Sequence, residues 1–311
     1  MKIASFGLLA GCGMWVGLAG CASTQHRSAA EYFADANDNF RQGALNVAID
    51  QYHELLDQHP FSEHNEEAEL KIAHAHYLAG NYAEAIVALS DFQRRHPTSP
   101  HLPFVGYYLG MCYVQQMGTI DTDQTASQNA HTYFMTVSRQ YPDSPYAVLA
   151  NQELAKCREA LAQHELYVAK FYSRHANYKA AEMRLLTLAA QYGETEASAD
   201  GLLALADYYR ENQQGANAAL AYRTILENNP KSLQAQTARA ELASLADDGE
   251  PTPDDPLDTL LAAHGRQRST ANFETARLPD ATNVKTVRRA PPPGPAAFGP
   301  VSSPFGRGRP Y

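Results

Sequence analysis

Cysteine and tryptophan are scarce in this sequence, and charged residues are few. The 311 residues include four cysteines and one tryptophan, Trp15, and only 19% of them are charged. Four cysteines are too few for a scaffold held together by disulfides, so we expect the fold to depend on a buried core, which a chain with 44% hydrophobic residues can supply. The net charge of −9 excludes a nucleic-acid-binding body, because such a body needs a basic face to neutralise phosphates.

Motifs that carry catalysis or bind metals and phosphates are also missing. No GxSxG, phosphate-binding loop, dinucleotide fingerprint or CxxC pair occurs. His74 and His76 lie two positions apart and diverge on a helix, and His164 has no second histidine four positions later. An enzyme with its catalytic residues in the segment 118–128 is an alternative, but that segment holds two aspartates and no histidine, lysine, arginine or cysteine. We therefore expect no active site, no metal and no cofactor.

The N-terminus has the features of a secretory signal. Lys2 supplies a positive charge, and residues 3–18 form an apolar stretch that is interrupted by four glycines and is too short to span a membrane. The stretch ends in Leu18-Ala19-Gly20-Cys21, which resembles the lipobox of bacterial lipoproteins. That resemblance implies a signal peptide over 1–20 and a lipidated cysteine at Cys21, followed by a linker over 21–30.

Two alternatives to lipidation at Cys21 are open. A second lipobox-like match ends at Cys12 but leaves a signal of only about half the usual apolar length, and an ordinary cleavage site beside an incidental cysteine is also compatible. Ala22 and Ser23 follow Cys21 in place of an aspartate, which by the sorting rule of enteric lipoproteins implies the outer membrane. We expect a soluble body that is tethered to that membrane by lipid and faces the periplasm.

Residues 31–246 contain an internal repeat. Each copy has an alanine followed four positions later by an aromatic residue or leucine, and a proline or glycine further on. The alanines recur at intervals of 37, 45, 51 and 37 residues. They are Ala48, Ala85, Ala130, Ala181 and Ala218. Because a small residue lets two helices approach closely and proline ends a helix, each copy predicts an antiparallel pair of helices.

This pattern resembles the tetratricopeptide repeat. The resemblance implies an all-α fold, a right-handed superhelical solenoid of about five helix pairs, whose first helices form a long concave face that binds peptides from other proteins. We expect these first helices over 32–41, 68–79, 104–115, 164–174 and 202–211. Cys112 and Cys157 fall within helical patterns. We expect two buried single thiols there, and a disulfide between them is an open alternative.

The composition changes after residue 246. Eleven of the 18 prolines lie in 247–311, where an acidic stretch over 247–258 is followed by eight basic and two acidic residues over 264–311. This predicts a proline-rich, disordered tail, with one short helix over Leu257–Ala263. A solvated terminus is the simple interpretation. The alternative is contact with an anionic envelope component through Arg288, Arg289, Arg307 and Arg309.

Residues 31–246 resemble the BamD family of outer-membrane assembly lipoproteins. The resemblance rests on His59-Pro60-Phe61, on Tyr141-Pro142-Asp143-Ser144 and above all on Glu165-Leu166-Tyr167-Val168-Ala169-Lys170-Phe171-Tyr172, which is close to a helix typical of that family. The segment 118–128 is shorter than in enteric members and lacks their arginines and aromatic residues. The tail after residue 246 is foreign to the family.

The resemblance implies a scaffold, not an enzyme, that helps to fold and insert outer-membrane proteins. Its implied partners are the β-barrel assembly pore protein, accessory lipoproteins and unfolded outer-membrane proteins, with no nucleic acid. Arg184 lies on the fourth repeat, where the family also carries an arginine, and would dock the pore protein, because arginine can clamp a carboxylate with two hydrogen bonds. A solvated charge on the helix surface is the competing interpretation. The candidate residues for receiving unfolded proteins are Asn37, Phe40, Leu70, His74, Tyr77, Tyr107 and Met111.

Two further interpretations keep the fold and change the role. One is a lipidated pilotin that binds the C-terminus of a secretin, and the other is a periplasmic coordinator of cell division that binds the Tol system. The coordinator usually has an N-terminal coiled coil, for which residues 22–31 are too short. The pilotin shares the same architecture, and only the helix over 165–172 favours the assembly factor. For each receiving residue, packing between repeats is the competing interpretation.

Overall fold

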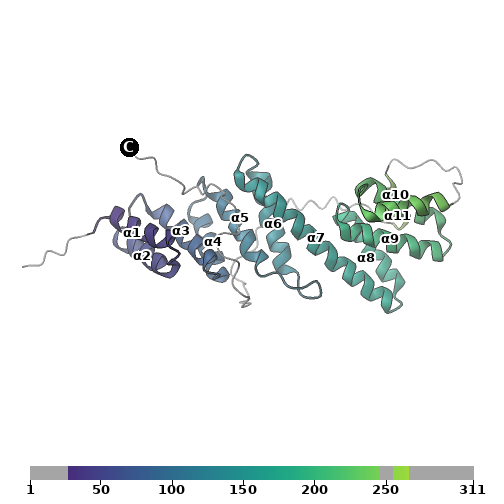
Figure 1. Cartoon of the computed structure of the whole chain (residues 1–311), viewed down its shortest axis with the longest axis horizontal. Coiled ribbons are helices and arrows are strands. Elements are labelled where there is room, and N and C mark those ends of the chain that lie inside the picture. The colour runs from purple at the N-terminus through teal and green to yellow at the C-terminus, as the bar shows by residue number, and fades with distance from the viewer. Residues whose placement is uncertain (1–26, 246–254, 266–311) are drawn as a thin grey trace, which may run out of the picture.

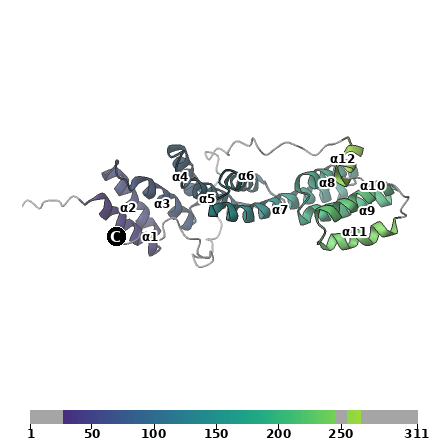
Figure 2. The ribbon, with the colours of Figure 1, turned by 90° about the horizontal axis from the view of Figure 1, so that it is seen from above.

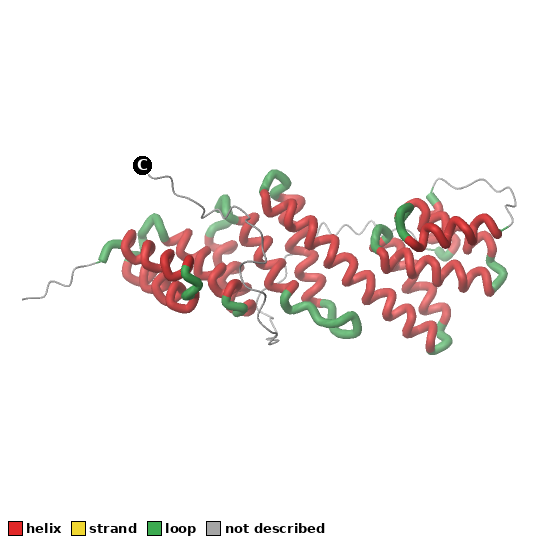
Figure 3. The backbone as a smooth tube through the Cα atoms, in the orientation of Figure 1, coloured by secondary structure: helices red, strands yellow, loops and turns green. Residues whose placement is uncertain are grey.

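The computed structural model describes residues 27–245 and 255–265, and every regular element in those two ranges is a helix (Figures 1 and 3). The predicted signal peptide, Cys21 and most of the tail lie outside the described residues. The helices are α1 (Ala29–Arg41), α2 (Leu45–Gln58), α3 (Asn65–Leu78), α4 (Tyr82–Arg95), α5 (Leu102–Val114), α6 (Thr125–Gln140), α7 (Pro145–Arg174), α8 (Tyr178–Tyr192), α9 (Glu196–Glu211), α10 (Gly215–Asn228), α11 (Leu233–Ser244) and α12 (Pro256–Ala263).

The prediction of an all-α repeat stack is confirmed. Helices α1 to α10 form five successive pairs in an elongated array, and each helix packs against the next along the chain (Figure 1). The first helices also pack on one another, α3 on α5, α5 on α7 and α7 on α9. All five anchoring alanines lie on second helices and are at most 3% exposed. Their small side chains therefore sit at the close contacts, as the repeat pattern predicts.

The turns between paired helices have the same backbone conformation and spacing at the two ends of the stack. The backbone has a positive φ at Gly43 (79°), Gly80 (79°), Ala176 (57°) and Gln213 (58°), each between the two helices of a pair. Gly43 and Ala176 lie 133 positions apart, and so do Gly80 and Gln213. The same shift carries the first residue of α2 onto that of α8, and the first residue of α4 onto that of α10. The first two pairs and the last two pairs are therefore equivalent units.

Helix α7 joins these two units. It is 30 residues long and continuous from Pro145 to Arg174, whereas the sequence predicted a helical spacer over 144–162 followed by a first helix over 164–174. Cys157 in its N-terminal half belongs to the apolar cluster built from α3 to α6, and Leu161 one turn later belongs to the cluster built from α8 to α12. One rigid helix thus contributes to both cores.

The C-terminal boundary at residue 246 needs correction. The short helix expected over Leu257–Ala263 is present as α12, but it does not extend into solvent. Its Leu257, Leu260 and Leu261 are at most 2% exposed and join the apolar cluster of the last two pairs. Helix α12 packs against α10 and α8 (Figure 2). The folded body therefore includes residues 255–265, where the burial of three leucines stabilises the packing of α12 on the stack.

Both predicted thiols are buried and free. Cys112 and Cys157 lie in the same apolar cluster without a disulfide. Burial raises the pKa of the Cys157 thiol to about 12 and raises that of Cys112 further. Among the described residues, no helix combines the length and the apolar character needed to cross a bilayer.

Candidate functional site

Aromatic rings from three first helices meet around His74. The imidazole of His74 on α3 lies 5.6 Å from the ring of Phe40 on α1, 5.2 Å from Phe104 and 4.7 Å from Tyr108 on α5, measured between ring centroids. Tyr107 extends the group toward α7 through a ring contact with Tyr146 at 5.7 Å. We call Phe40, His74, Phe104, Tyr107 and Tyr108 the aromatic cluster.

His74 is an unusual member of the aromatic cluster because its polar atoms are unsatisfied. Both ring nitrogens are shielded from solvent, and neither has a hydrogen-bond partner within the protein. Burial, with a smaller contribution from the charge of Lys71, lowers the pKa of His74 to about 4. The imidazole is therefore neutral at physiological pH, with one donor and one acceptor nitrogen. An unpaired buried polar group costs about 1–3 kcal/mol of stability.

A buried lysine borders the aromatic cluster. Lys71 lies one turn before His74 on α3 and is only 7% exposed. Its ammonium group lies 5.3 Å from the centre of the Phe40 ring and 3.7 Å from the carboxylate of Glu67. Burial lowers the pKa of Lys71. The sequence did not single out Lys71, although its position one turn from His74 on the same face was the available signal.

The structure separates the seven predicted receiving residues into two groups. Leu70, Tyr77 and Met111 are at most 5% exposed and belong to the apolar cluster between the repeats. The expectation that these three side chains face a ligand is wrong, and packing between repeats is their role. Asn37, Phe40, His74 and Tyr107 keep partial exposure on the first helices.

Asn37 has a structural partner as well as an exposed edge. Its side-chain oxygen accepts a hydrogen bond of 2.7 Å from the hydroxyl of Tyr52, which lies on the second helix of the same pair. This bond satisfies the phenol of a fully buried tyrosine. Asn37 therefore holds α1 and α2 together, while Phe40 one turn later carries the aromatic contact with His74.

Arg184 lies on the surface of α8 and pairs with α7. Its guanidinium donates to the carboxylate of Glu165 over 3.0 Å, and its side chain is about half exposed. Glu165 is the first residue of the sequence 165–172 that carried the family resemblance. An incoming carboxylate could share or take over this arginine, because the guanidinium has further donors.

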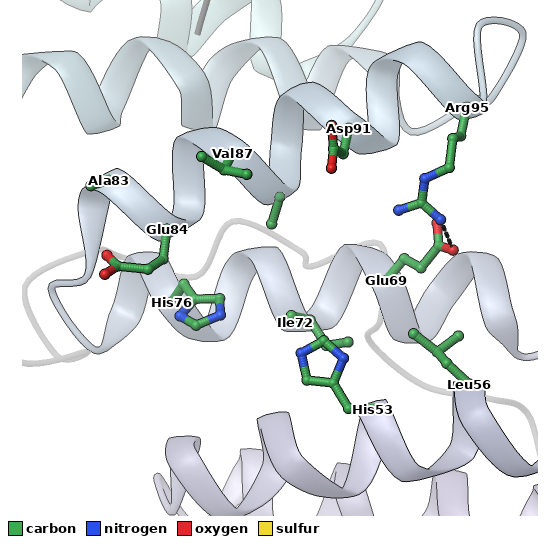
Figure 4. A pocket seen from close by; sticks show the side chains of 11 residues that line it. His53, Leu56, Glu69, Ile72, His76, Ala83, Glu84, Val87, Asp91 and Arg95 are labelled. Carbon is green, nitrogen blue, oxygen red and sulfur yellow. Dashed lines mark hydrogen bonds and ion pairs between the residues drawn. The ribbon is translucent and has the colours of Figure 1, made fainter. Parts of the chain in front are cut away.

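A groove lies on the other side of α3, between the second helices α2 and α4. It encloses about 600 Å³ and has Ile72 and His76 of α3 at its base. In Figure 4 the guanidinium of Arg95 bonds to Glu69 at one end, and Glu84 and His76 lie together at the other. We call this feature the α2–α4 groove. It is lined by His53, Leu56, Glu69, Ile72, His76, Ala83, Glu84, Val87, Ala88, Asp91 and Arg95.

Nothing in the described part of the chain is arranged for metal chemistry. No group of three or more histidine, cysteine, aspartate or glutamate side chains in residues 27–245 and 255–265 is placed to hold a metal ion. The arrangement offers aromatic, apolar and charged surfaces on stacked helices. These features define an all-helical repeat protein, a class whose stacked helices present extended surfaces.

The chain belongs to the YfiO family, described as outer membrane lipoprotein. The family profile matches residues 25–246, which contain every helix from α1 to α11. Helix α12 lies beyond the matched region. This family agrees with the resemblance carried by residues 31–246.

Several curated relatives share one name. A protein of Haemophilus influenzae called outer membrane protein assembly factor BamD is 26% identical over 211 residues, which is 64% of this chain and 80% of that protein. A protein of the same name from Caulobacter vibrioides is 27% identical over 186 residues, or 57% of this chain and 61% of that protein. The TPR2AB domain of yeast Sti1, solved in a complex with pHSP90, covers 76% of this chain at 17% identity, but its TM-score of 0.36 adds nothing to the assignment.

Proposed function

We propose that this protein is a lipid-anchored scaffold and receptor in the β-barrel assembly machinery of the outer membrane. The observation that carries the proposal is the family match over the complete stack α1–α11, together with relatives named as outer membrane protein assembly factors. The role is binding and not catalysis. The family match and the names of these relatives favour the assembly factor over the pilotin and the Tol-system coordinator.

The proposed anchor is lipid attached to Cys21. Helix α1 begins at Ala29, soon after this cysteine, so the first helix pair would lie close to the periplasmic face of the membrane. Each buried CH₂ group of an attached chain contributes about 0.8 kcal/mol, and two or more chains make the anchoring stable. A Cys21→Ser variant should leave the outer-membrane fraction and appear as soluble periplasmic protein.

The aromatic cluster is the proposed receiving surface for unfolded outer-membrane proteins. Phe40 and Tyr107 offer partly exposed rings, and stacking on rings tolerates varied sequence. His74 lies beneath these rings with both nitrogens shielded from solvent and supports Phe40 through their ring contact. A Phe40→Ala/Tyr107→Ala variant should bind an unfolded barrel protein at least about fivefold more weakly. Val47→Ala, an exposed apolar residue on α2, is the control.

The partners are tested by isolating the complex that the protein forms. Tagged, lipidated full-length protein is purified in mild detergent, and the co-purifying proteins are identified by mass spectrometry. A β-barrel pore protein recovered in near-stoichiometric amount supports the proposal. Recovery of a secretin or a Tol component in its place would overturn the function and leave the fold and the family unchanged.

A further inference from the structure

Helix α12 shows how a groove on this stack is filled. It packs on the second helices α8 and α10, and its three leucines lie in one apolar cluster with Leu220 of α10. At its end, the imidazole of His264 lies 3.0 Å from the hydroxyl of Tyr209, which lies on the first helix α9. The chain therefore uses a short amphipathic helix to close the space between two second helices over a first helix.

The α2–α4 groove is the equivalent space in the first two helix pairs. The shift of 133 positions that relates the two ends carries α2, α3 and α4 onto α8, α9 and α10. It also carries Val87 onto Leu220 and His76 onto Tyr209. Val87 is 53% exposed, whereas Leu220 beside α12 is 9% exposed. The position equivalent to the one covered by α12 is thus open in the described N-terminal pairs.

The residue of the α2–α4 groove that is equivalent to Tyr209, His76, lacks a hydrogen-bond partner at one ring nitrogen. The Nδ1 atom of His76 is shielded from solvent and has no hydrogen-bond partner in the protein, whereas the equivalent Tyr209 contacts both Glu182 and His264. Burial lowers the pKa of His76, which favours its neutral form. In Figure 4 the ring of His76 lies among the groove-lining side chains beside Glu84.

The charge of the two grooves differs. Glu69, Glu84 and Asp91 line the α2–α4 groove. Arg95 pairs with Glu69, and Arg94 pairs with Asp91 over 2.7 Å, so Glu84 is the lining carboxylate outside these two ion pairs. The residues equivalent to the three carboxylates are Leu202, Asn217 and Thr224, which are neutral. Helix α12 itself carries Asp258 and begins at the cap residue Asp255. Glu182 beside it is met by His264, whereas Glu84 in the α2–α4 groove would repel an acidic helix.

We infer that the α2–α4 groove is a docking site for a short basic amphipathic helix of a partner protein. The partner helix presents apolar side chains with the spacing of Leu257, Leu260 and Leu261 toward Val87 and Ile72. Its lysine or arginine side chains face Glu84 and compete with Arg94 for Asp91, and a polar group near its end meets the ring of His76. This surface is distinct from the aromatic cluster and from Arg184, so it does not depend on the proposed role in barrel assembly.

The test uses a labelled peptide and the full-length protein in detergent. The probe has the sequence of residues 255–265 with D258K, T259K and A262K, three changes at exposed positions of α12 that preserve its leucines. Binding is followed by fluorescence anisotropy. The probe should bind at least about tenfold more tightly than the unchanged, acidic peptide, and its affinity should fall as salt is raised. Equal affinity for the two peptides would overturn the proposal.

Matched variants locate the binding site. Val87→Asn should weaken probe binding about fivefold, whereas Val148→Asn, the same change at an exposed valine on α7, should not. Glu84→Gln/Asp91→Asn should abolish most of the salt dependence, and the control Glu211→Gln/Glu227→Gln should preserve it. If the Val87 and Val148 variants bind alike, the peptide occupies another surface, such as the groove of α12, and the inference is wrong.

Discussion

His264 on α12 lies with its Nε2 atom 3.0 Å from a carboxylate oxygen of Glu182 on α8. The hydroxyl of Tyr209 donates to the same oxygen over 2.8 Å, and the other ring nitrogen of His264 lies 2.9 Å from the carbonyl oxygen of Leu260. Three helices therefore meet at one polar point beside the buried leucines. These contacts fix the C-terminal end of α12.

The first prediction concerns the attachment of α12. His264→Ala should loosen this helix without unfolding the stack, because one buried polar anchor contributes on the order of 1 kcal/mol. Amide hydrogen exchange over residues 257–263 should accelerate about fivefold to tenfold, with α1–α6 unchanged. His175→Ala, at an exposed histidine directly after α7, is the control. Unchanged exchange in α12 would show that the leucines alone hold it.

The second prediction concerns the contact between α5 and α6. A Cβ atom added at Gly110 would lie 2.5 Å from the ring of Phe134, which is fully buried. Gly110→Ala should therefore lower the free energy of unfolding by about 1–3 kcal/mol. Gly215→Ala places the same methyl group in open space at the start of α10 and should be neutral or stabilising by up to about 1 kcal/mol. Chemical denaturation of the two variants measures both effects.

The third prediction is a loss of stability in acid. Burial lowers the pKa of His74 and of His131 to about 4 each, from an ordinary value of 6.5. Below pH 6.5 the unfolded chain takes up protons that the folded protein accepts only near pH 4. The free energy of unfolding should therefore fall as the pH drops through this window, by about 2–3 kcal/mol for each histidine.

A substitution isolates the part of this effect that belongs to His74. His74→Phe keeps an aromatic ring beside Phe40 and cannot be protonated, so the dependence of stability on pH between 6.5 and 4 should become shallower. Denaturation curves at several pH values measure the slope. His53→Phe, at an exposed histidine on α2, should keep the original slope. A steep slope retained by the His74 variant would contradict the assignment.

The fourth prediction separates docking by Arg184 from its internal ion pair. Arg184→Glu should reduce recovery of the assembly pore protein, because it reverses a charge at the proposed docking surface and also repels Glu165. The double variant Arg184→Glu/Glu165→Arg restores the pair within the protein. If the role is docking, recovery should remain low in the double variant. Recovery that returns to normal would show that Arg184 acts only by holding α7 and α8 together.

The fifth prediction concerns the number of reactive cysteine thiols in the folded and the denatured protein. The raised pKa values of Cys112 and Cys157 and their burial should make both unreactive toward a disulfide reagent at pH 8 in the folded protein. After denaturation, mature protein lipidated at Cys21 should expose two reactive thiols, and protein with a free Cys21 should expose three. Absorbance of the released thiolate gives the count, and a third reactive thiol would contradict lipidation.

Local chemistry explains why much of the fold was predictable. The buried alanines, exemplified by Ala48 and Ala218, recur at spacings that only paired helices satisfy, and prolines and glycines mark the ends of those helices. The continuous α7 was predicted only as two pieces, because a helix that passes from one repeat to the next carries no turn residue to mark the boundary. Only the structure shows that it joins the two cores.

The candidate site was less predictable, because exposure depends on neighbouring helices. Leu70, His74 and Tyr77 lie at helical spacing on one face of α3, and sequence spacing treats them alike. The structure buries Leu70 and Tyr77 between repeats and surrounds His74 with rings from α1 and α5. Side chains that are distant along the chain cover part of such a face, and they determine which of its residues remain accessible.

By itself the sequence determined the helix pairs and their order, because these follow from short-range spacing of small, apolar and helix-ending residues. The family followed from resemblance of particular motifs such as residues 165–172, and the family profile confirms it. Tertiary structure decided two further matters. It placed α12 against α8 and α10, although this helix lies in a segment whose composition predicts disorder, and it kept the equivalent α2–α4 groove open. The physical reason is that burial is a property of surfaces brought together by folding, and a leucine such as Leu260 stabilises the protein only where a matching apolar surface exists.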